Sequence, residues 1–283
     1  MKSAAITKQN RQALPPGSRL WTPNNLKHVI SWLSPRRLLR LGIGSGLSVW
    51  RDAKQNSQFV QSTVSRRPTL TSTAGQFKGL RVPEFDGTSD FLADESPSDL
   101  FDIDAGDFFV MAAIRTGDDV SGTQTIINVQ RESASEQIWL RTLFGKTDTR
   151  LQISFGGFAG SFCSGTTAIT TNTTYLVYGE RIGNGVDVYL NGVKDNAASI
   201  ASTVVINNSS PAVIGARNTS ATNPFGGKIA EVVMGGTDAP AALQSPIITT
   251  KTRQLLEGYM AHNCGIADVL PSDHPYRKGP PRR

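Results

Sequence analysis

The chain has 283 residues, 38% of them hydrophobic, so it can bury a sizeable core, and global disorder is excluded. No segment reaches the roughly 18–20 consecutive apolar residues that cross a bilayer, and two cysteines, Cys163 and Cys264, are too few for a disulfide framework. The net charge of +6 is uneven, because residues 1–82 hold 14 Lys and Arg against one acid, whereas residues 83–250 hold 9 against 19.

The N-terminal region begins with a polar, basic segment that contains Pro15-Pro16-Gly17, so we expect residues 1–20 to form an arm outside the core. This segment lacks the apolar stretch of a secretory signal, and we expect the protein to be made in a cytoplasm. Ordered structure is predicted from Trp21 onward, with Trp32 pointing inward. Strands are predicted at residues 28–33, 47–52 and 58–63, and residues 35–46 (PRRLLRLGIGSG) predict one helical turn and a glycine-rich loop.

From residue 79 onward, alternating apolar and polar residues predict a series of short strands. Gly183-Asn184-Gly185 and Asn191-Gly192 supply the positive φ angles that tight hairpins need. The strands predicted here are 79–87, 107–116, 123–130, 136–144, 149–157, 175–181, 186–190, 211–218 and 227–236. So many short strands with frequent turns indicate an all-β sandwich or barrel.

The hydrophobic period changes to that of a helix only near the C-terminus. We expect a closing helix over about residues 247–264 that ends at Gly265 and packs Leu255, Tyr259 and Met260 on the sandwich. The proline-rich residues 271–283 have no apolar pattern and predict an extended basic tail.

Residues 257–276 gather His262, Cys264 and His274, which invites a metal or nucleophile interpretation. Residues two apart on a helix lie about 200° apart around its axis, so His262 and Cys264 face different sides. His274 falls in the predicted extended tail. We therefore expect Cys264 to be a small buried residue rather than a ligand or nucleophile.

Several motifs resemble those of concanavalin A-like lectin/glucanase (laminin-G-like) domains, in the variety common in phage virion and environmental bacterial proteins. They are WTPNNLKHVISWL (21–33), WRDAKQN (50–56), VPEFDGTSDFL (82–92), YLNG (189–192), VIGARN (213–218), GKIAEVV (227–233) and the ending from Leu255 to Pro281. The resemblance implies one two-sheet antiparallel jelly roll over residues 21–270. The fold hosts glycan binders, hydrolases and structural virion parts, so it leaves function open.

Catalysis is weakly indicated. Glucanases of this superfamily use carboxylates alternating on one strand; Glu84 and Asp86 have the spacing, but Thr88 and Ser89 stand where a third carboxylate would be. We expect no enzymatic activity.

A calcium site is a second possibility, because residues 84–107 hold nine acids and no Lys or Arg. Asp102, Asp104 and Asp107 are the candidate ligands, but DIDAGD lacks the spacing of a known calcium loop. The alternative is a solvated acidic loop, or one that faces the basic N-terminal region. We therefore predict no metal or other cofactor.

Glycan binding needs exposed aromatic side chains beside amides and carboxylates. The candidates are four phenylalanines in glycine-flanked loops: Phe155, Phe158, Phe162 and Phe225. Packing at the sandwich edge is the alternative for each of them.

The basic flanks are poor core material and suit contacts with acidic neighbours in an assembly. The residues in question are Arg36, Arg37, Arg40, Arg277 and Lys278. Together with the resemblance to domains of phage virion proteins, these flanks predict a non-enzymatic bacteriophage virion protein, either a capsid decoration or a tail or fibre component. We expect it to self-associate, with a trimer as the first expectation, and to contact other virion proteins and host-surface polysaccharide. We expect it to bind neither membrane nor nucleic acid. The alternatives are a stand-alone carbohydrate-binding module and a divergent glycoside hydrolase.

Overall fold

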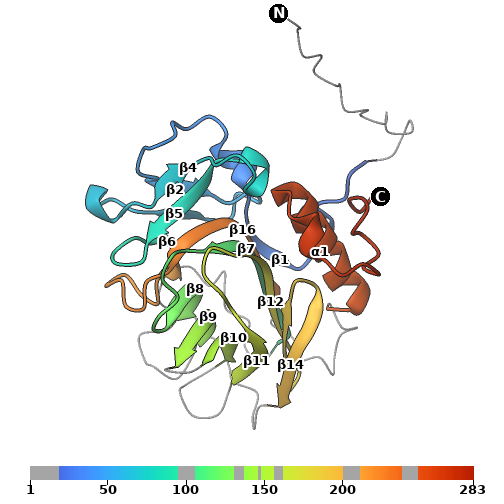
Figure 1. Ribbon diagram of the computed structural model, residues 1–283. Helices are drawn as coiled ribbons and strands as arrows, with labels where there is room; N and C mark the ends of the chain where they lie inside the picture. Colours follow the sequence, from blue (N-terminus) through green and yellow to red (C-terminus); the bar gives the residue numbers. More distant parts are fainter. Residues whose placement is uncertain are drawn as a thin grey trace, which may run out of the picture.

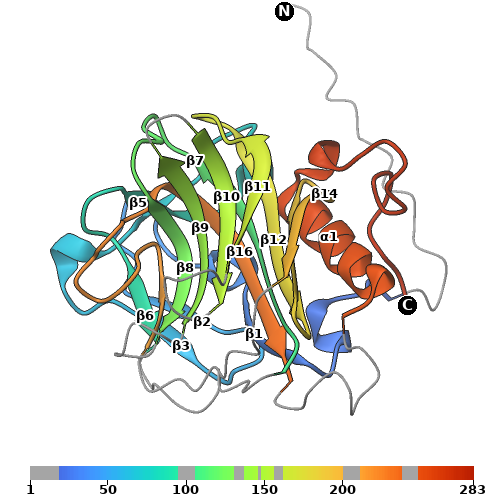
Figure 2. The same cartoon turned by 90° about the horizontal axis from the view of Figure 1, so that it is seen from below.

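The computed structural model describes residues 19–94, 106–130, 137–145, 148–155, 162–199, 211–237 and 248–283. Within these ranges two antiparallel β-sheets pack face to face, and the helix α1 (Thr250–Cys264) lies against the outer face of one of them (Figures 1 and 2). The predicted two-sheet jelly roll with a C-terminal helix is confirmed. No helix in the described ranges is long and apolar enough to span a membrane.

The first sheet carries α1. Its strands follow the order β14-β13-β12-β7-β16-β5-β4, and β1 pairs with the C-terminal half of β16. The strands are β1 (Val29–Leu33), β4 (Thr69–Thr71), β5 (Val82–Asp86), β7 (Phe108–Thr116), β12 (Thr174–Ile182), β13 (Gly185–Leu190), β14 (Val193–Ser199) and β16 (Gly226–Gly236).

The second sheet packs on the face of the first sheet that is turned away from α1. Its strands follow the order β11-β10-β9-β8-β15-β6-β3-β2. The strands are β2 (Val49–Arg51), β3 (Gln58–Val60), β6 (Leu92–Asp94), β8 (Gln124–Gln130), β9 (Gln137–Gly145), β10 (Asp148–Phe155), β11 (Phe162–Ala168) and β15 (Ala212–Ile214). Short 3-10 turns lie at Pro23–Asn25, Pro35–Leu38, Val64–Arg66, Phe77–Gly79 and Ala267–Val269.

Strand β7 shows why the fold has three layers. Its side chains alternate between two faces, and both faces are apolar. Val110 and Ala112 belong to the core between the sheets, whereas Phe109 and Met111 belong to the core between the first sheet and α1. A strand that is apolar on both faces must be covered on both, and α1 supplies the second cover. Trp32 is buried as predicted, but it packs on the helix side.

The two predicted tight turns are confirmed. Ile182 pairs with Gly185 across a turn in which Gly183 has φ 55°, and Leu190 pairs with Val193 across Asn191 (φ 55°) and Gly192 (φ 82°). These left-handed conformations match the twist of hairpin strands. The predicted helical turn after Ser34 is also confirmed, as the 3-10 turn Pro35–Leu38.

Helix α1 begins at Thr250, where the Thr249 hydroxyl accepts a hydrogen bond from the Thr252 amide (3.1 Å), and it ends at Gly265 (φ 73°). The prediction of an extended tail is wrong: residues 271–279 make successive turns against the helix. The Arg277 guanidinium donates to the carbonyls of Asp268 and Leu270, which closes these turns. Arg282 then forms a β-bridge with Leu20, so the described ends of the chain lie together.

Candidate ligand-binding site

The four predicted glycan-contacting phenylalanines do not form one surface. Phe225 is 0% exposed and packs edge-on against Phe85, with ring centroids 6.4 Å apart, so its assignment to an exposed platform is wrong. The cause is local: the Phe225 amide donates to the Gly215 carbonyl (2.8 Å), which turns the side chain into the sandwich. Phe162 is 43% exposed at the start of β11. Phe155 ends β10, and Phe158 lies outside the described residues.

Of the calcium candidates, Asp102 and Asp104 lie outside the described residues. Asp107 is buried, and its carboxylate accepts a hydrogen bond from the Gly183 amide (3.0 Å). Its charge also acts on the buried Arg181. Asp107 therefore joins β7 to the β12–β13 hairpin. In the described part of the chain, no three His, Cys, Asp or Glu side chains are grouped so that they could hold a metal ion.

Glu84 and Asp86, the candidate catalytic carboxylates, both make contacts that stabilise the fold. Glu84 lies 3.8 Å from the Lys228 ammonium. Asp86 accepts hydrogen bonds from the amides of Thr88 and Ser89 (both 2.8 Å), and so it closes the turn after β5. Burial would raise the pKa of Asp86, but these amides and that of Asp90 outweigh it, and the pKa is lowered. This pattern is that of a turn, not of an acid/base pair.

Asp90, beside Asp86, supplies a pH-dependent test. Burial, and then the charge of Asp86, raise the pKa of Asp90 from 3.8 to about 6. A carboxyl whose pKa is raised by folding contributes stability below pH 4 that is lost as the pH rises through 6. We expect the stability of Asp90→Asn relative to the native chain to improve by about 2 kcal/mol between pH 4 and pH 7. Urea unfolding at both pH values measures this, and a difference that does not change with pH would refute it.

The stretch with His262, Cys264 and His274 contains no reactive cluster. The Cys264 thiol is buried and lies 3.3 Å from a Glu231 oxygen, and burial together with that charge raises its pKa well above the usual value. The ring of His262 faces elsewhere, with Nε2 2.7 Å from the Tyr276 carbonyl, and burial lowers its pKa. Cys264 is thus a small buried residue, as predicted.

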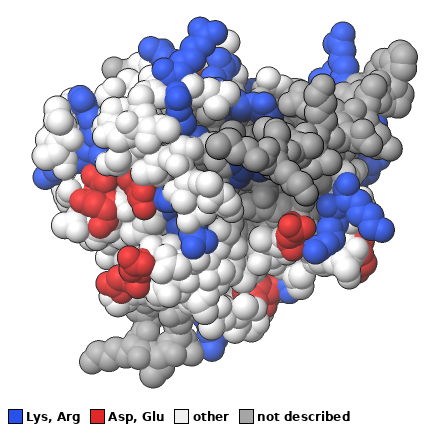
Figure 3. All heavy atoms as spheres, turned by 45° about the horizontal axis from the view of Figure 1, so that its top comes forward, with Lys and Arg blue, Asp and Glu red and all other residues white. Residues whose placement is uncertain are grey.

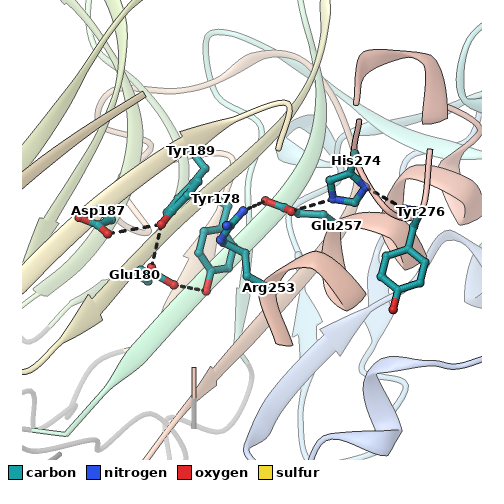
Figure 4. A network of polar contacts seen from close by, with 8 residues as sticks. All are labelled: Tyr178, Glu180, Asp187, Tyr189, Arg253, Glu257, His274 and Tyr276. Carbon is teal, nitrogen blue, oxygen red and sulfur yellow. Dashed lines mark hydrogen bonds and ion pairs between the residues drawn. The ribbon is translucent and has the colours of Figure 1, made fainter. Parts of the chain in front are cut away.

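His274 is the exception, because it is buried rather than part of an extended tail. Its Nε2 lies 3.1 Å from Glu257 of α1, whose other oxygen accepts from Arg253 (2.7 Å). The Arg253 guanidinium stacks 3.9 Å from the centroid of the Tyr189 ring on β13. Figure 4 shows this chain of contacts from the tail, through α1, to the first sheet. It fixes the position of the helix.

A second buried carboxylate, that of Glu231 on β16, joins the C-terminal part of α1 to the first sheet. It is 0% exposed and accepts hydrogen bonds from Trp32 Nε1 (2.7 Å) and Tyr259 Oη (3.2 Å). Asn263 Nδ2 (2.8 Å) and the Cys264 thiol supply two more donors. Burial raises the pKa of Glu231, although these donors lower it in part. The carboxylate therefore holds four side chains from α1 and β1 in register.

Three of the donors to Glu231, namely Trp32, Tyr259 and Asn263, also line a cavity of about 380 Å³, which we call the aromatic pocket. Its lining residues are Leu20, Trp21, Thr22, Trp32, Arg36, Lys78, Tyr259, His262, Asn263 and Pro280. The rings of Trp21 and Trp32 both meet Tyr259 edge-on, with centroids 6.2 and 5.7 Å away. The volume lies within the range of about 300–1,000 Å³ typical of small-molecule sites.

The polar rim of the aromatic pocket is held in place by the fold. Arg36 Nε donates to Asn263 Oδ1 (2.6 Å), and Lys78 Nζ donates to the His262 carbonyl (2.9 Å). Two cations and a carboxamide therefore surround an aromatic floor. Sequence reasoning missed this site, because its aromatic residues come from segments more than 200 positions apart and each one matched a core pattern.

The outer face of the second sheet is also polar. Arg141 of β9 donates through Nε to Gln152 Oε1 (2.6 Å), and Gln152 donates to Ser164 Oγ (2.6 Å). Burial, and then the nearby charge of Arg217, lower the pKa of Arg141 to about 10. Gln152 itself is only 2% exposed, so its carboxamide is enclosed by its neighbours.

Three of the residues predicted to make assembly contacts form hydrogen bonds within the chain. Arg36 reaches Asn263, Arg37 Nη2 donates to the Ala53 carbonyl (3.1 Å), and Arg277 closes the tail turns. Arg40 and Lys278 are exposed.

Comparison with solved structures places the fold. The binding domain of Paraclostridial Mosquitocidal Protein 1 matches with a TM-score of 0.53 and 11% identity, over 82% of this chain and 52% of that one. A mutant of Trypanosoma rangeli sialidase displaying trans-sialidase activity matches with a TM-score of 0.52 and 12% identity, over 87% of this chain and 34% of that one. This chain thus spans about half the length of the mosquitocidal binding domain and about a third of the length of the sialidase. At such identities the likeness shows the fold alone.

Comparison with curated proteins found no significant match. The family model for the concanavalin A-like lectin/glucanases superfamily matches residues 86–235, which is more than half of the chain and includes most strands of both sheets. The chain therefore belongs to the concanavalin A-like lectin/glucanases superfamily.

Proposed function

We propose that the chain is a non-enzymatic structural protein of a bacteriophage virion, displaying a lectin-like domain that binds surface glycans. The observation that carries the glycan part is the aromatic pocket. Trp21, Trp32 and Tyr259 line it with aromatic side chains, the kind on which sugar rings pack, and each keeps 7–8% of its surface exposed. Arg36 and Lys78 at the rim supply charged hydrogen-bond donors for sugar oxygens.

A non-enzymatic role is supported by the state of the candidate carboxylates. Asp86 is saturated by backbone amides, and Glu84 is paired with Lys228. The buried Glu231 and Glu257 are held by donors from the helix and tail. Glycoside hydrolysis needs two carboxyl groups that flank a bound sugar. These four carboxylates serve the fold instead.

The virion part of the proposal is supported by the distribution of charge. The basic N-terminal part and the acidic middle of the chain would orient copies against one another or against other virion proteins. Figure 3 shows basic side chains along the upper part of one face, and acidic ones lower down, where further basic side chains lie among them. Exposed Arg40 and Lys278 are then the first residues to test as assembly contacts. Assembly in the host cytoplasm as a homo-oligomer, for which a trimer is our first model, completes the proposal.

Glycan binding is tested with an array of cell-surface glycans and three variants. We expect the native chain to bind a subset of glycans, and Arg36→Ala and Lys78→Ala to weaken binding about tenfold by removing charged donors at the rim. Arg40→Ala removes the same charge outside the pocket and should bind as the native chain does. Equal binding by all four proteins would place the glycan elsewhere, and no binding by any would overturn the glycan part.

The virion assignment is tested separately, by mass spectrometry of purified phage particles from the source of the sequence. We expect the protein in stoichiometric amounts in washed particles. Its presence in the lysate but not in the particles would favour a stand-alone carbohydrate-binding module.

A further inference from the structure

The two neighbouring arginines of the 3-10 turn Pro35–Leu38 serve different surfaces. Arg36 reaches Asn263 at the rim of the aromatic pocket. Arg37 instead lines a separate cavity of about 640 Å³, together with Arg51 of the edge strand β2. The remaining lining residues are Asp52, Gln55, Asn56, Ser57 and Gln58, from β2, β3 and the turn that joins them.

The wall of this cavity is built around Asp52. Its buried carboxylate accepts hydrogen bonds from the amides of Trp32 (2.7 Å), Lys54 and Asn56 (both 3.1 Å), so its oxygens are directed into the turn. Burial raises the pKa of Asp52, although these amides lower it in part. Gln55, at φ 65°, completes the turn. The turn thus presents carboxamides and a hydroxyl on a fixed backbone.

Among the described residues, no acidic side chain pairs with either guanidinium group. Arg37 Nη2 is held by the Ala53 carbonyl (3.1 Å) and Arg51 Nη1 by Gln58 Oε1 (3.0 Å). Within the described residues neither makes an ion pair, unlike Lys194, Lys228 and Arg253. In addition, Ser57 Oγ is buried in the turn and makes no hydrogen bond to a described residue.

A second cavity of about 410 Å³ continues the first, because both are lined by Arg37 and Arg51. It adds Leu41, which is 39% exposed, and the backbone of Gly42 and Gly46. We call the two cavities together the Arg37–Arg51 groove. One end has two cations with amide and hydroxyl groups, and the other has an apolar side chain.

We propose that the Arg37–Arg51 groove binds a saccharide that carries carboxylate groups. A guanidinium group matches a carboxylate in shape and charge and can hold it through two hydrogen bonds. Gln55, Asn56 and Gln58 suit the hydroxyl groups of a sugar, and Leu41 suits its apolar face.

Two other classes of ligand fit the groove less well. Protein partners anchor mainly on aromatic side chains in buried pockets, and neither cavity is lined by an aromatic side chain; the aliphatic side chains Leu41, Leu47, Val49 and Leu70 line only the second cavity. Single-stranded nucleic acids need aromatic side chains on which bases stack, and neither cavity is lined by one. The groove would bind its ligand whether or not the aromatic pocket binds a glycan.

The test is a calorimetric titration of the full chain with tri-galacturonic acid, with maltotriose as the neutral counterpart. We expect tri-galacturonic acid to bind and maltotriose not to bind at the groove. Arg37→Gln and Arg51→Gln should each weaken the binding about tenfold, and raising NaCl from about 50 to about 300 mM should weaken it as well. Arg40→Gln, also exposed on this segment, should leave the affinity unchanged. Thermal melts of the three variants check that they fold.

Three results would overturn the proposal. Equal affinity for maltotriose would show that the carboxylates are not recognised. An equal loss in Arg40→Gln would show that only net charge matters. Equal binding of inorganic phosphate or of an oligo-aspartate peptide would make the groove a general anion site. Failure here is distinguishable from failure of the glycan array, because Arg36 and Lys78 do not line the groove.

Discussion

Replacing Glu231 with alanine is expected to lower the free energy of unfolding by about 4 kcal/mol or more, which approaches the total stability of many domains. The carboxylate is fully buried and accepts from Trp32, Tyr259, Asn263 and Cys264. Each buried donor left without an acceptor costs about 1–3 kcal/mol, less for a thiol. We therefore expect α1 to separate from the sheet, and the chain to be largely insoluble at 37 °C.

Glu231→Gln is the matched control. It keeps the shape and one acceptor oxygen, so we expect a loss of only about 1–2 kcal/mol. Urea unfolding followed by tryptophan fluorescence measures both variants, because Trp32 reports directly on the site. Similar losses in the two variants would contradict this expectation, because they would show that keeping the shape of the side chain and one acceptor oxygen does not preserve stability.

Replacing Gly258 with alanine is expected to destabilise the chain by about 2–3 kcal/mol, although alanine favours a helix by about 1 kcal/mol over glycine. A Cβ at this position would lie 2.3 Å from Cβ and 2.7 Å from Cγ of Tyr276. The tail would have to move away from α1, and His274 would lose its place beside Glu257. Hydrogen exchange should then rise across residues 271–279.

Gly279→Ala is the control for this variant, because a Cβ there meets no atom within 4 Å. We expect it to leave both the stability and the exchange of the tail unchanged. A Gly258→Ala chain more stable than the native one would mean that the tail does not pack on α1 as described.

The sequence predicts the positions of the strands that have a strong apolar pattern. β7 and β16 are long and apolar, and both were predicted within one residue of their bounds. β14 (VKDNAAS) was missed because Val193 is its only large apolar residue and the strand is held by its hairpin to β13. β11 (FCSGTTA) was missed because Gly165 and its polar residues hide the alternation. β4 and β6 have three residues each, which is too short to show a period.

The candidate site was harder to predict, for a physical reason. Local patterns tell which face of an element is apolar, but not what covers that face. The local pattern therefore predicts that Trp21 and Tyr259 are core residues, and only the folded chain shows that they also line a pocket. Phe225 is predicted to be exposed because it lies among glycines, yet its side chain is buried between the two sheets. His274 can be buried because its polar partner is Glu257 of α1, which is itself paired with Arg253.

The most direct test of the account is a crystal structure of the chain soaked with the glycan that binds best on the array. We predict a sugar ring in the aromatic pocket, against Trp21 and Tyr259, with its oxygens near Arg36 and Lys78. A sugar bound at Phe162 or on the outer face of the second sheet, with the aromatic pocket empty, would contradict the account.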